Sequence, residues 1–512
     1  MLKVLIATDF SYKSCRNRIF FVTLRQISVP YTSYIMKENI IGRETQIADL
    51  EMYMESGRSE FIAIYGRRRI GKTYLVKELF ESQLLFRVTG MDNVNTHDQI
   101  HNFCHAMNIQ FGTNHQAANW IEAFHFLEKE IEKDNNKDVK ILFFDELPWF
   151  DTRGSNFISA LEHFWNDWAS SRSELMVIIC GSATTWMNDN VISQKGGLHN
   201  RVTRKIKLSQ FNLHETSLFL ARKGIKWTNH QIAECYMVLG GTPYYLDLLR
   251  KGYSLPQNVD FLFFRNNAEL DGEYDVLLKS LFKDSQTYRR VIELLAKRSK
   301  GMTRKEMCEE LKFSDGGAFT TILENLRNCD FIRSYSAFGK KDRDTMYQLG
   351  DMFILFYLKF VKNGGGKDEA FWSNSIDDPA RRAWSGYAFE QLCLSHIPQI
   401  KEALGIRGIL SNVCSWYKKG DSEKGIKGHQ IDILIERRDQ VINVCEAKFS
   451  NRPYVVTGKY LQEMFERMED FRDTVKTNAA LHLTMIASDG LATNEYSSEV
   501  QSVVTLDDLF KN

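Results

Sequence analysis

Residues 61–80, FIAIYGRRRIGKTYLVKELF, set a phosphate-binding pattern between a predicted strand and a predicted helix. The apolar run 61–65 is typical of a buried strand, and the spacing of apolar residues in 74–80 favours a helix. The loop between them, Gly66 to Thr73, satisfies every position of G-x-x-x-x-G-K-[ST]. Backbone N–H groups of such a loop and the positive end of the following helix stabilise a phosphate chain. The pattern therefore predicts an α/β fold that binds ATP or GTP.

Each residue type in this loop has its own part in that prediction. Gly66 and Gly71 let the backbone approach the phosphates closely. Lys72 is placed to reach the terminal phosphates, and the Thr73 hydroxyl to ligate a Mg²⁺ that bridges phosphate oxygens. The alternative is a glycine-rich turn before an ordinary helix. The loop residues expected to contact the nucleotide are Gly66, Arg67, Arg68, Arg69, Ile70, Gly71, Lys72 and Thr73.

A second apolar run, within residues 139–150, ends in Asp145 and Glu146. Acidic residues at the end of a hydrophobic strand are costly unless they have a function. Asp145 is expected to hold the Mg²⁺ shell near the nucleotide, and Glu146 to polarise the attacking water. A strand that simply enters a solvated loop is the alternative. The glutamate favours hydrolysis over mere nucleotide binding.

Two further polar segments follow in the same alternating α/β pattern. The predicted strand 175–180 leads into GSATTWM, where Ser182 or Thr184 could sense the terminal phosphate or could equally cap a helix. Arg201 follows a glycine pair and could stabilise transition-state charge, in cis or from a neighbouring subunit. A solvated basic turn is the more frequent outcome for such an arginine.

Composition limits the remaining possibilities. The 66 basic and 65 acidic residues nearly cancel, so any nucleic-acid surface is a local patch. The nine cysteines include no C-x-x-C pair, which favours reduced thiols in a cytosol. No apolar run approaches the roughly 20 residues of a membrane helix, so we expect a cytoplasmic protein without a membrane partner. Residues 1–35 show no clear period, and we expect the functional chain to begin at Met36.

The middle of the chain changes character twice. Helical patterning dominates residues 213–282 and predicts a helical lid over the nucleotide domain 36–212. Residues 283–362 show three predicted helices and two strands around a charged tip, which predicts a winged helix. Lys340, Lys341 and Arg343 on that tip could touch DNA phosphates. The third helix offers few side chains suited to base edges, so a structural or protein-binding role is an equal alternative.

Residues 363–512 carry a separate constellation after a predicted hinge at 363–366. Segment 428–450 predicts a β-hairpin centred on Asp439, which sets Asp432 opposite Glu446, with Lys448 on the same face. Two acids can hold Mg²⁺ or Mn²⁺, and Lys448 can position a water and stabilise a phosphate. Glu390, on a predicted helix, could complete the metal shell. A charge-decorated edge hairpin is the alternative. The opposite face is expected to be apolar through Ile431, Ile433, Ile435, Cys445 and Phe449.

Two family resemblances rest on these motifs. Residues 36–282, with GRRRIGKT, FFDELPWF, ICGSATTWM, GGLHNRVTR and GGTPYYL, resemble the prokaryotic AAA-like P-loop ATPases of the archaeal ATPase family. Residues 283–512, with GYAFEQL, HQIDILIE and CEAKFS, look like the winged helix and restriction-endonuclease-like domain of the PD-(D/E)XK superfamily. The second resemblance implies Glu390 as the helical acid, Asp432 as the PD acid, and Glu446 with Lys448 as the E-x-K pair. Ile431 stands where that motif has proline.

Together these features predict an ATPase whose nucleotide state regulates a C-terminal Mg²⁺-dependent DNA nuclease. ATP, Mg²⁺ and DNA are the expected ligands, and a homo-oligomer is compatible with Arg201 acting between subunits. A different class is a nucleotide-dependent switch or scaffold that binds nucleic acid or protein without cleavage. A third is an ATP-fuelled remodelling ring.

Overall fold

The computed structural model describes most of the chain from residue 39 onward. The described residues are 39–136, 138–182, 185–192, 197–335, 338, 345–362, 368–418, 420 and 428–512. Several predicted features lie outside them, namely the extension 1–35, Thr184, the tip residues Lys340, Lys341 and Arg343, and the hinge 363–366.

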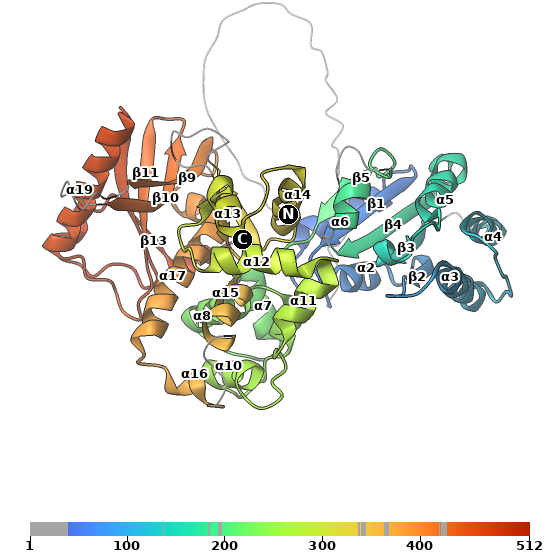
Figure 1. Ribbon diagram of the computed structural model, residues 1–512, viewed down its shortest axis with the longest axis horizontal. Helices are drawn as coiled ribbons and strands as arrows, with labels where there is room; N and C mark the ends of the chain where they lie inside the picture. The colour runs from blue at the N-terminus through green and yellow to red at the C-terminus, as the bar shows by residue number, and fades with distance from the viewer. Residues whose placement is uncertain are drawn as a thin grey trace, which may run out of the picture. The chain divides into compact units, whose positions relative to one another are not determined.

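A five-stranded parallel sheet forms the first part of the described chain (Figure 1). Its strands are β1 (Glu60–Gly66), β2 (Leu84–Thr89), β3 (Lys140–Asp145), β4 (Leu175–Ser182) and β5 (Arg204–Lys207). They are ordered β2-β3-β4-β1-β5, and every neighbouring pair is parallel. β4 therefore lies between β1 and β3, and the carboxyl ends of all three meet at one edge.

Helices cover both faces of this sheet, as its apolar strands predict. The helices are α1 (Glu44–Met54), α2 (Lys72–Phe80), α3 (Thr96–Phe111), α4 (Trp120–Lys133) and α5 (Phe157–His163). Alternate residues of β1 enter different cores. Phe61 packs in a cluster with α3, α4 and α5, whereas Ile62 packs with α1 and α2. The predicted α/β fold with a parallel sheet is confirmed.

A helical region follows the sheet. It contains α7 (Leu213–Arg222), α8 (Asn229–Leu239), α9 (Pro243–Asp247), α10 (Leu255–Phe263) and α11 (Glu273–Leu281). Capping boxes start α7, α8 and α10, with N-caps Asn212, Thr228 and Ser254. The helical conformation is interrupted between α8 and α9 at Gly241, where a Cβ would lie 1.9 Å from the Phe211 carbonyl oxygen.

Three helices and three short strands come next. They are α12 (Ser285–Ala296), β6 (Met302–Thr303), α13 (Arg304–Leu311), α14 (Gly317–Asn328), β7 (Ile332–Tyr335) and β8 (Met346–Leu349). The strands form an antiparallel sheet ordered β6-β8-β7. The chain then enters α15 (Met352–Phe356), which continues into the π-helical turn η6 (Tyr357–Val361).

A second five-stranded sheet forms the C-terminal part, with strand order β13-β12-β11-β10-β9 (Figure 1). The strands are β9 (Ser411–Lys418), β10 (His429–Arg437), β11 (Val441–Lys448), β12 (Ala480–Ala487) and β13 (Ser502–Thr505). The helices are α16 (Phe371–Asn374), α17 (Pro379–Ser395), α18 (Ile397–Ala403), α19 (Gly458–Val475) and α20 (Leu506–Leu509). β9, β10 and β11 pair antiparallel, and β11, β12 and β13 pair parallel.

The predicted hairpin register is confirmed. Ile433 pairs with Cys445, so the ladder is symmetric about Asp439. Asp432 and Glu446 are the next residues along the two strands. The three-residue turn between β10 and β11 ends at Gln440 with φ 63°. A left-handed residue at this turn position is typical of three-residue hairpins.

The alternative of an edge hairpin fails because β10 and β11 lie inside the sheet, flanked by β9 and β12. One detail of the hairpin prediction is wrong: Ile431 does not share a core with Ile433 and Ile435. A register irregularity between Ile431 and Leu434 in the pairing with β9 shifts the alternation, so Ile431 packs in the cluster that contains residues of α19.

The C-terminal part is packed against the helical region. One hydrophobic cluster runs from Phe211 in that region to Leu509 in α20. Polar contacts join the same elements: His214 Nδ1 lies 3.0 Å from the Phe510 carbonyl oxygen, and Asn229 donates to Asp507 over 2.7 Å. The domain boundaries expected at residues 282 and 362 stay predictions. Within the described residues, no helix has the length and apolar character needed to span a membrane.

His396, at the junction of α17 and α18, gives this packing a pH dependence. Its ring is buried; Nε2 accepts from the Leu213 N–H over 3.0 Å, and Nδ1 lies 2.9 Å from the Leu392 carbonyl oxygen. The ring can serve both partners only as the neutral tautomer protonated at Nδ1. Burial lowers the pKa of His396 to about 4.

We expect acid to destabilise this junction. The unfolded chain takes up a proton near pH 6.5, whereas the folded ring does so only near pH 4, so the free energy of unfolding falls across that window. At pH 4, this group lowers the free energy of unfolding by about 3 kcal/mol relative to neutral pH. Urea unfolding at several pH values, compared with His396→Gln, measures it. The glutamine variant should lose stability less steeply below pH 6.5, and equal slopes would contradict the assignment.

Candidate functional site

The phosphate loop begins where β1 ends, and two glycines give it its path. Gly66 has φ 151°, and a Cβ there would lie 2.2 Å from the Leu208 carbonyl oxygen. Gly71 has φ 89° and directly precedes α2, with open space where its Cβ would be. Glycine is thus required at position 66 because a side chain would clash with the neighbouring backbone, and it is favoured at position 71 by the backbone conformation alone.

Lys72 lies folded back into this loop. Its Nζ donates to the carbonyl oxygens of Gly66 and Arg67, both over 3.0 Å, and the side chain is buried. Burial lowers the pKa of Lys72, and the nearby carboxylates of Glu146 and Asp145 partly oppose that effect. The ammonium is held beside the loop, at the place from which the predicted phosphate contact would be made.

Thr73 and Asp145 meet across the sheet edge. The Thr73 hydroxyl donates to Asp145 Oδ2 over 2.8 Å. Asp145 is buried, and burial raises its pKa, although the Thr73 hydrogen bond opposes the rise. Hydroxyl and carboxylate oxygens are the donors that Mg²⁺ prefers, so these two residues fit the predicted metal shell.

Glu146 follows Asp145 in a left-handed backbone conformation, φ 49° and ψ 49°. A non-glycine residue in this region costs of order 1 kcal/mol and is common at functional sites. Its N–H donates to Asp145 Oδ1 over 3.0 Å, and its side chain lines the cavity described below. Burial raises the pKa of Glu146, with Lys72 acting in the opposite direction.

Ser182 and Arg201 have different placements. Ser182 is buried and ends β4, the strand between β1 and β3, in register with Gly66 of β1. Arg201 precedes β5 and does not line the cavity at the loop among the described residues. Its Nε is buried and has no hydrogen-bond partner within that part of the chain. Its action on a neighbouring subunit stays a prediction.

The three arginines of the loop diverge. Arg67 forms an ion pair with Asp351, next to α15, and is fully buried. Arg68 is exposed. Arg69 pairs with Glu273 of α11 over 2.6 Å, and its guanidinium lies 4.2 Å from the centre of the Tyr244 ring. The side chains of Arg67 and Arg69 are thus engaged with other elements, while their backbone remains part of the loop.

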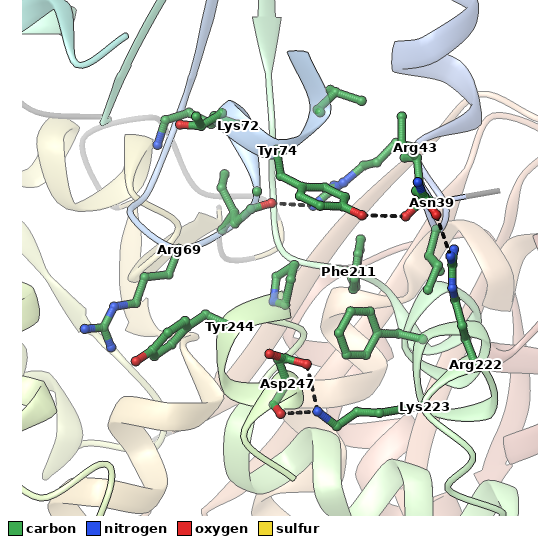
Figure 2. Close-up of a pocket in the computed structure, with 18 of the residues that line it drawn as sticks. Asn39, Arg43, Arg69, Lys72, Tyr74, Phe211, Arg222, Lys223, Tyr244 and Asp247 are labelled. Atoms are coloured by element: carbon green, nitrogen blue, oxygen red, sulfur yellow. Dashed lines mark hydrogen bonds and ion pairs between the residues drawn. The ribbon is translucent and has the colours of Figure 1, made fainter. Parts of the chain in front are cut away.

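A cavity of about 640 Å³ opens beside the loop (Figure 2). Its apolar wall comes from Ile40, Ile41, Phe211 and Phe219, and its floor from the loop and α2. Polar pairs close the rim. Asn39 accepts from the Tyr74 hydroxyl over 2.9 Å and from Arg222 over 3.0 Å, and Lys223 pairs with Asp247 over 2.7 Å (Figure 2).

Sequence reasoning missed these wall residues. Ile40 and Ile41 come from the segment before α1, whereas Phe211, just before α7, and Phe219, within α7, are far from the loop in the chain. The only local signal is the apolar pair Ile40 and Ile41 ahead of α1, which is too short to indicate a binding surface. An apolar cavity beside a phosphate loop suits a flat base at one end and phosphates at the other.

A second cavity, of about 610 Å³, lies on the C-terminal sheet. Glu390 of α17, Asp432 of β10 and Glu446 of β11 all line it, as the sequence predicts. Lys448 Nζ donates to Glu446 Oε1 over 2.8 Å, and Arg467 of α19 donates to Glu446 Oε2 over 3.0 Å. Arg467 was not predicted, because nothing local marks its position on a long charged helix.

The three acids influence one another. Burial raises the pKa of Glu390 to about 8, with further rises from Asp432 and Glu446 and an opposing effect from Lys448. Burial also raises the pKa of Asp432, whose carboxylate accepts from the Gln430 amide. Clustered, desolvated carboxylates of this kind suit a divalent cation. Among the described residues, however, no group of three His, Cys, Asp or Glu side chains is arranged to hold a metal ion as it stands.

Comparison with known proteins bears on the first of these sites. A family model described as an ATPase domain predominantly from Archaea matches residues 40–249. This stretch has the α/β fold of P-loop nucleotide-binding domains and is similar to that ATPase family. The match begins just before α1 and ends just after α9, so it includes the phosphate loop and the cavity walls. It leaves the C-terminal cleft outside.

Individual relatives are distant. An uncharacterized protein of Methanocaldococcus jannaschii is 25% identical over 386 residues, 74% of this chain and 82% of that protein. A Walker-type ATPase of Pyrococcus abyssi aligns with a TM-score of 0.44 at 17% identity, over 63% of this chain and 97% of its own. The ORC2 protein of Aeropyrum pernix aligns with a TM-score of 0.38 at 13% identity, over 63% and 95%. Both structural likenesses are too weak to add to the fold described above.

The two loop glycines give a stability test. We expect Gly66→Ala to lower the free energy of unfolding by more than about 2 kcal/mol, because its Cβ would push against backbone. Gly71→Ala should cost about 1 kcal/mol, since it meets only conformational strain. Urea unfolding of both variants and the wild type measures the difference. Equal losses in the free energy of unfolding would mean that the contact with the Leu208 carbonyl oxygen does not destabilise Gly66→Ala.

Proposed function

We propose that this protein binds and hydrolyses ATP in the cavity beside the phosphate loop, and that its nucleotide state regulates a Mg²⁺-dependent DNA nuclease-like site in the C-terminal cleft. The observation that carries the first part is the convergence of Lys72, Thr73, Asp145 and Glu146 at one sheet edge. The convergence of three acids in one cleft supports the second part.

At the first site, each residue has a role that its position supports. Lys72 exchanges its loop carbonyls for the terminal phosphates, and the loop N–H groups bind the phosphate chain. Thr73 and Asp145 would hold Mg²⁺, which neutralises charge on the phosphates when bound. Glu146 lies on the cavity wall, where its carboxylate can orient a water and accept its proton. Ser182, at the end of the strand next to the phosphate loop, is suited to contact the terminal phosphate.

The base end of the cavity supports ATP as the nucleotide. Phe211 and Phe219 offer flat apolar surface, and Asn39 is held at the rim by two hydrogen bonds. α7 and α9 belong to the helical region, which we interpret as a lid because both line the cavity. A bound nucleotide would therefore touch the sheet domain and the lid together, and its binding energy could change their relation.

We interpret the module from α12 to β8 as a winged helix. The order helix, strand, helix, helix, strand, strand, with the sheet β6-β8-β7, supports that interpretation. A contact with DNA backbone through this module is part of the proposal. The turn between α12 and β6 supplies Ser299 to the C-terminal cleft, so a nucleic acid in that cleft would also meet this module.

At the second site, Glu390, Asp432 and Glu446 would hold the metal, which would act as a Lewis acid toward a phosphodiester. Lys448 and Arg467 supply two positive charges beside Glu446, one on each of its oxygens. Lys448 can position an attacking water, and both cations can bind phosphate oxygens. This charge arrangement supports a nucleic-acid phosphate as the substrate group.

Two observations favour a second candidate function. Both oxygens of Glu446 are already engaged by cations, and the described acids do not form a ready metal group. A nucleotide-dependent switch that binds nucleic acid or protein through the cleft without cutting would not need Glu446 to leave its ion pairs or the acids to rearrange around a metal ion. The two candidates differ in whether the cleft breaks a phosphodiester bond.

Hydrolysis is tested by two variants at the first site. We expect Lys72→Ala to weaken ATP binding at least tenfold, because it removes the cation of the loop. Glu146→Gln should bind ATP within about threefold of the wild type yet lose hydrolysis at least a hundredfold, since it keeps the shape and removes the base. Fluorescent-nucleotide titration and phosphate release measure the two quantities. Unchanged phosphate release in Glu146→Gln would remove that residue from the mechanism.

Cleavage is tested on plasmid and linear DNA with Mg²⁺ or Mn²⁺, with and without ATP. We expect Glu446→Ala to lose cutting at least a hundredfold, because it removes a metal-holding carboxylate. Glu436→Gln is the matched control: it lies on the same hairpin, paired with Ile442, and does not line the cleft. If the wild type and Glu436→Gln cut DNA and Glu446→Ala does not, the result supports nuclease activity. If the wild type cuts nothing, the switch becomes the better account.

A further inference from the structure

The second residue of the phosphate loop does not face the nucleotide cavity. Arg67 is fully buried and absent from the cavity lining, and its Nη1 donates to Asp351 Oδ2. Its guanidinium lies 5.3 Å from the centre of the Phe331 ring. Both partners belong to the segments that flank β7 and β8, so the loop is held by a part of the chain more than 260 residues away.

Asp351 joins three elements through one carboxylate. Oδ2 accepts from Arg67 and, over 2.9 Å, from Gln210 Nε2, while Oδ1 caps α15 by accepting from the Ile354 N–H over 2.8 Å. The side chain is buried. A buried ion pair of this kind is costly to break one side at a time, because the remaining charge is left in a medium of low polarity. The phosphate loop and the start of α15 are therefore fixed to each other.

Lys72 belongs to the same unit. Its Nζ donates to the carbonyl oxygen of Arg67, the residue whose side chain holds Asp351. When Lys72 moves to a phosphate, the Arg67 peptide loses that hydrogen bond. The side chain of Arg67 thus forms the ion pair, while the hydrogen bond to its backbone carbonyl is lost when nucleotide binds.

α15 leads from this point to the C-terminal cleft through packed aromatic rings. Phe356, at the end of α15, and Phe360, in the following turn, each have ring centres 5.5 Å from Trp384 of α17. α17 is the helix that carries Glu390 into the cleft. Close-packed side chains transmit displacement because the interior has little free volume.

We propose that Arg67 is a positioning residue and that its ion pair with Asp351 couples nucleotide binding at the phosphate loop to α15 and α17. This coupling rests on the ATP binding of the proposed function and does not depend on cleavage. ATP releases Lys72 from Arg67, loosens the ion pair, and so weakens the cap of α15. The cleft thereby receives the nucleotide state through the ion pair.

The test uses amide hydrogen exchange of the full chain with and without a non-hydrolysable ATP analogue. In the wild type, the analogue should speed exchange in α15 and α17 by about twofold or more. The double variant Arg67→Met with Asp351→Asn removes both charges together, and asparagine can still cap α15. A binding titration of each protein sets an analogue concentration that saturates both, and exchange is measured at that concentration. In the double variant, α15 and α17 should exchange at the same rate with and without analogue.

Lys207→Met is the matched control. Lys207 pairs with Asp330 over 2.6 Å and so joins β5 to the segment after α14, without touching the loop. This variant should keep the wild-type response of α17. A double variant that still responds at a saturating analogue concentration would overturn the coupling, and so would a double variant that no longer binds the analogue, because Arg67 would then be a ligand.

The proposed function can be separated from the coupling in the same experiment. If the wild type does not bind the analogue, ATP binding fails and the coupling falls with it. If the wild type binds the analogue but α15 and α17 do not respond, only the coupling is overturned. Neither result depends on whether the cleft cuts DNA.

Discussion

Burial of charge at the carboxyl edge of the parallel sheet is the constraint on which the first site depends. Lys72 and Asp145 are both shielded from water there, so each needs a partner within the protein. Lys72 has the loop carbonyls and Asp145 has the Thr73 hydroxyl. A phosphate chain with its cation would offer each of them a counter-charge of opposite sign. The internal hydrogen bonds therefore hold the same atoms that the ligands would engage.

The sequence was sufficient to predict this edge and insufficient to predict its walls. Contiguous motifs predicted the loop and the acidic strand end, because local spacing sets which side chains meet at the end of a strand. The direction of Arg67 depends on Asp351, and the cavity wall depends on Phe211. Both contacts are between segments far apart in the chain. No local pattern distinguishes an arginine that binds phosphate from one that binds a distant carboxylate.

The C-terminal hairpin shows the same division. Its register followed from symmetry about Asp439, because a short turn fixes which residues face each other. Its position inside the sheet did not follow, because its neighbouring strands are not contiguous with it in the sequence: β9 ends at Lys418, and β12 begins at Ala480, after the long helix α19. The irregularity that turns Ile431 toward the other core is likewise a property of the pairing with β9. Arg467 reaches Glu446 only because α19 packs across the sheet.

The shared hydrophobic cluster has a consequence for how such a protein can be divided. Similarity to an ATPase family ends at residue 249, yet the cluster passes without a break from Leu246 through Phe263 and Phe356 to Leu392. A fragment cut at residue 249 would expose the apolar faces of α8 and α9 to water, at a cost that grows with the area uncovered. The end of the matched family domain and the end of the packed unit are thus at different places in the chain. Exchange of the C-terminal part between relatives would require the helices from α7 to α11 to be exchanged or repacked with it.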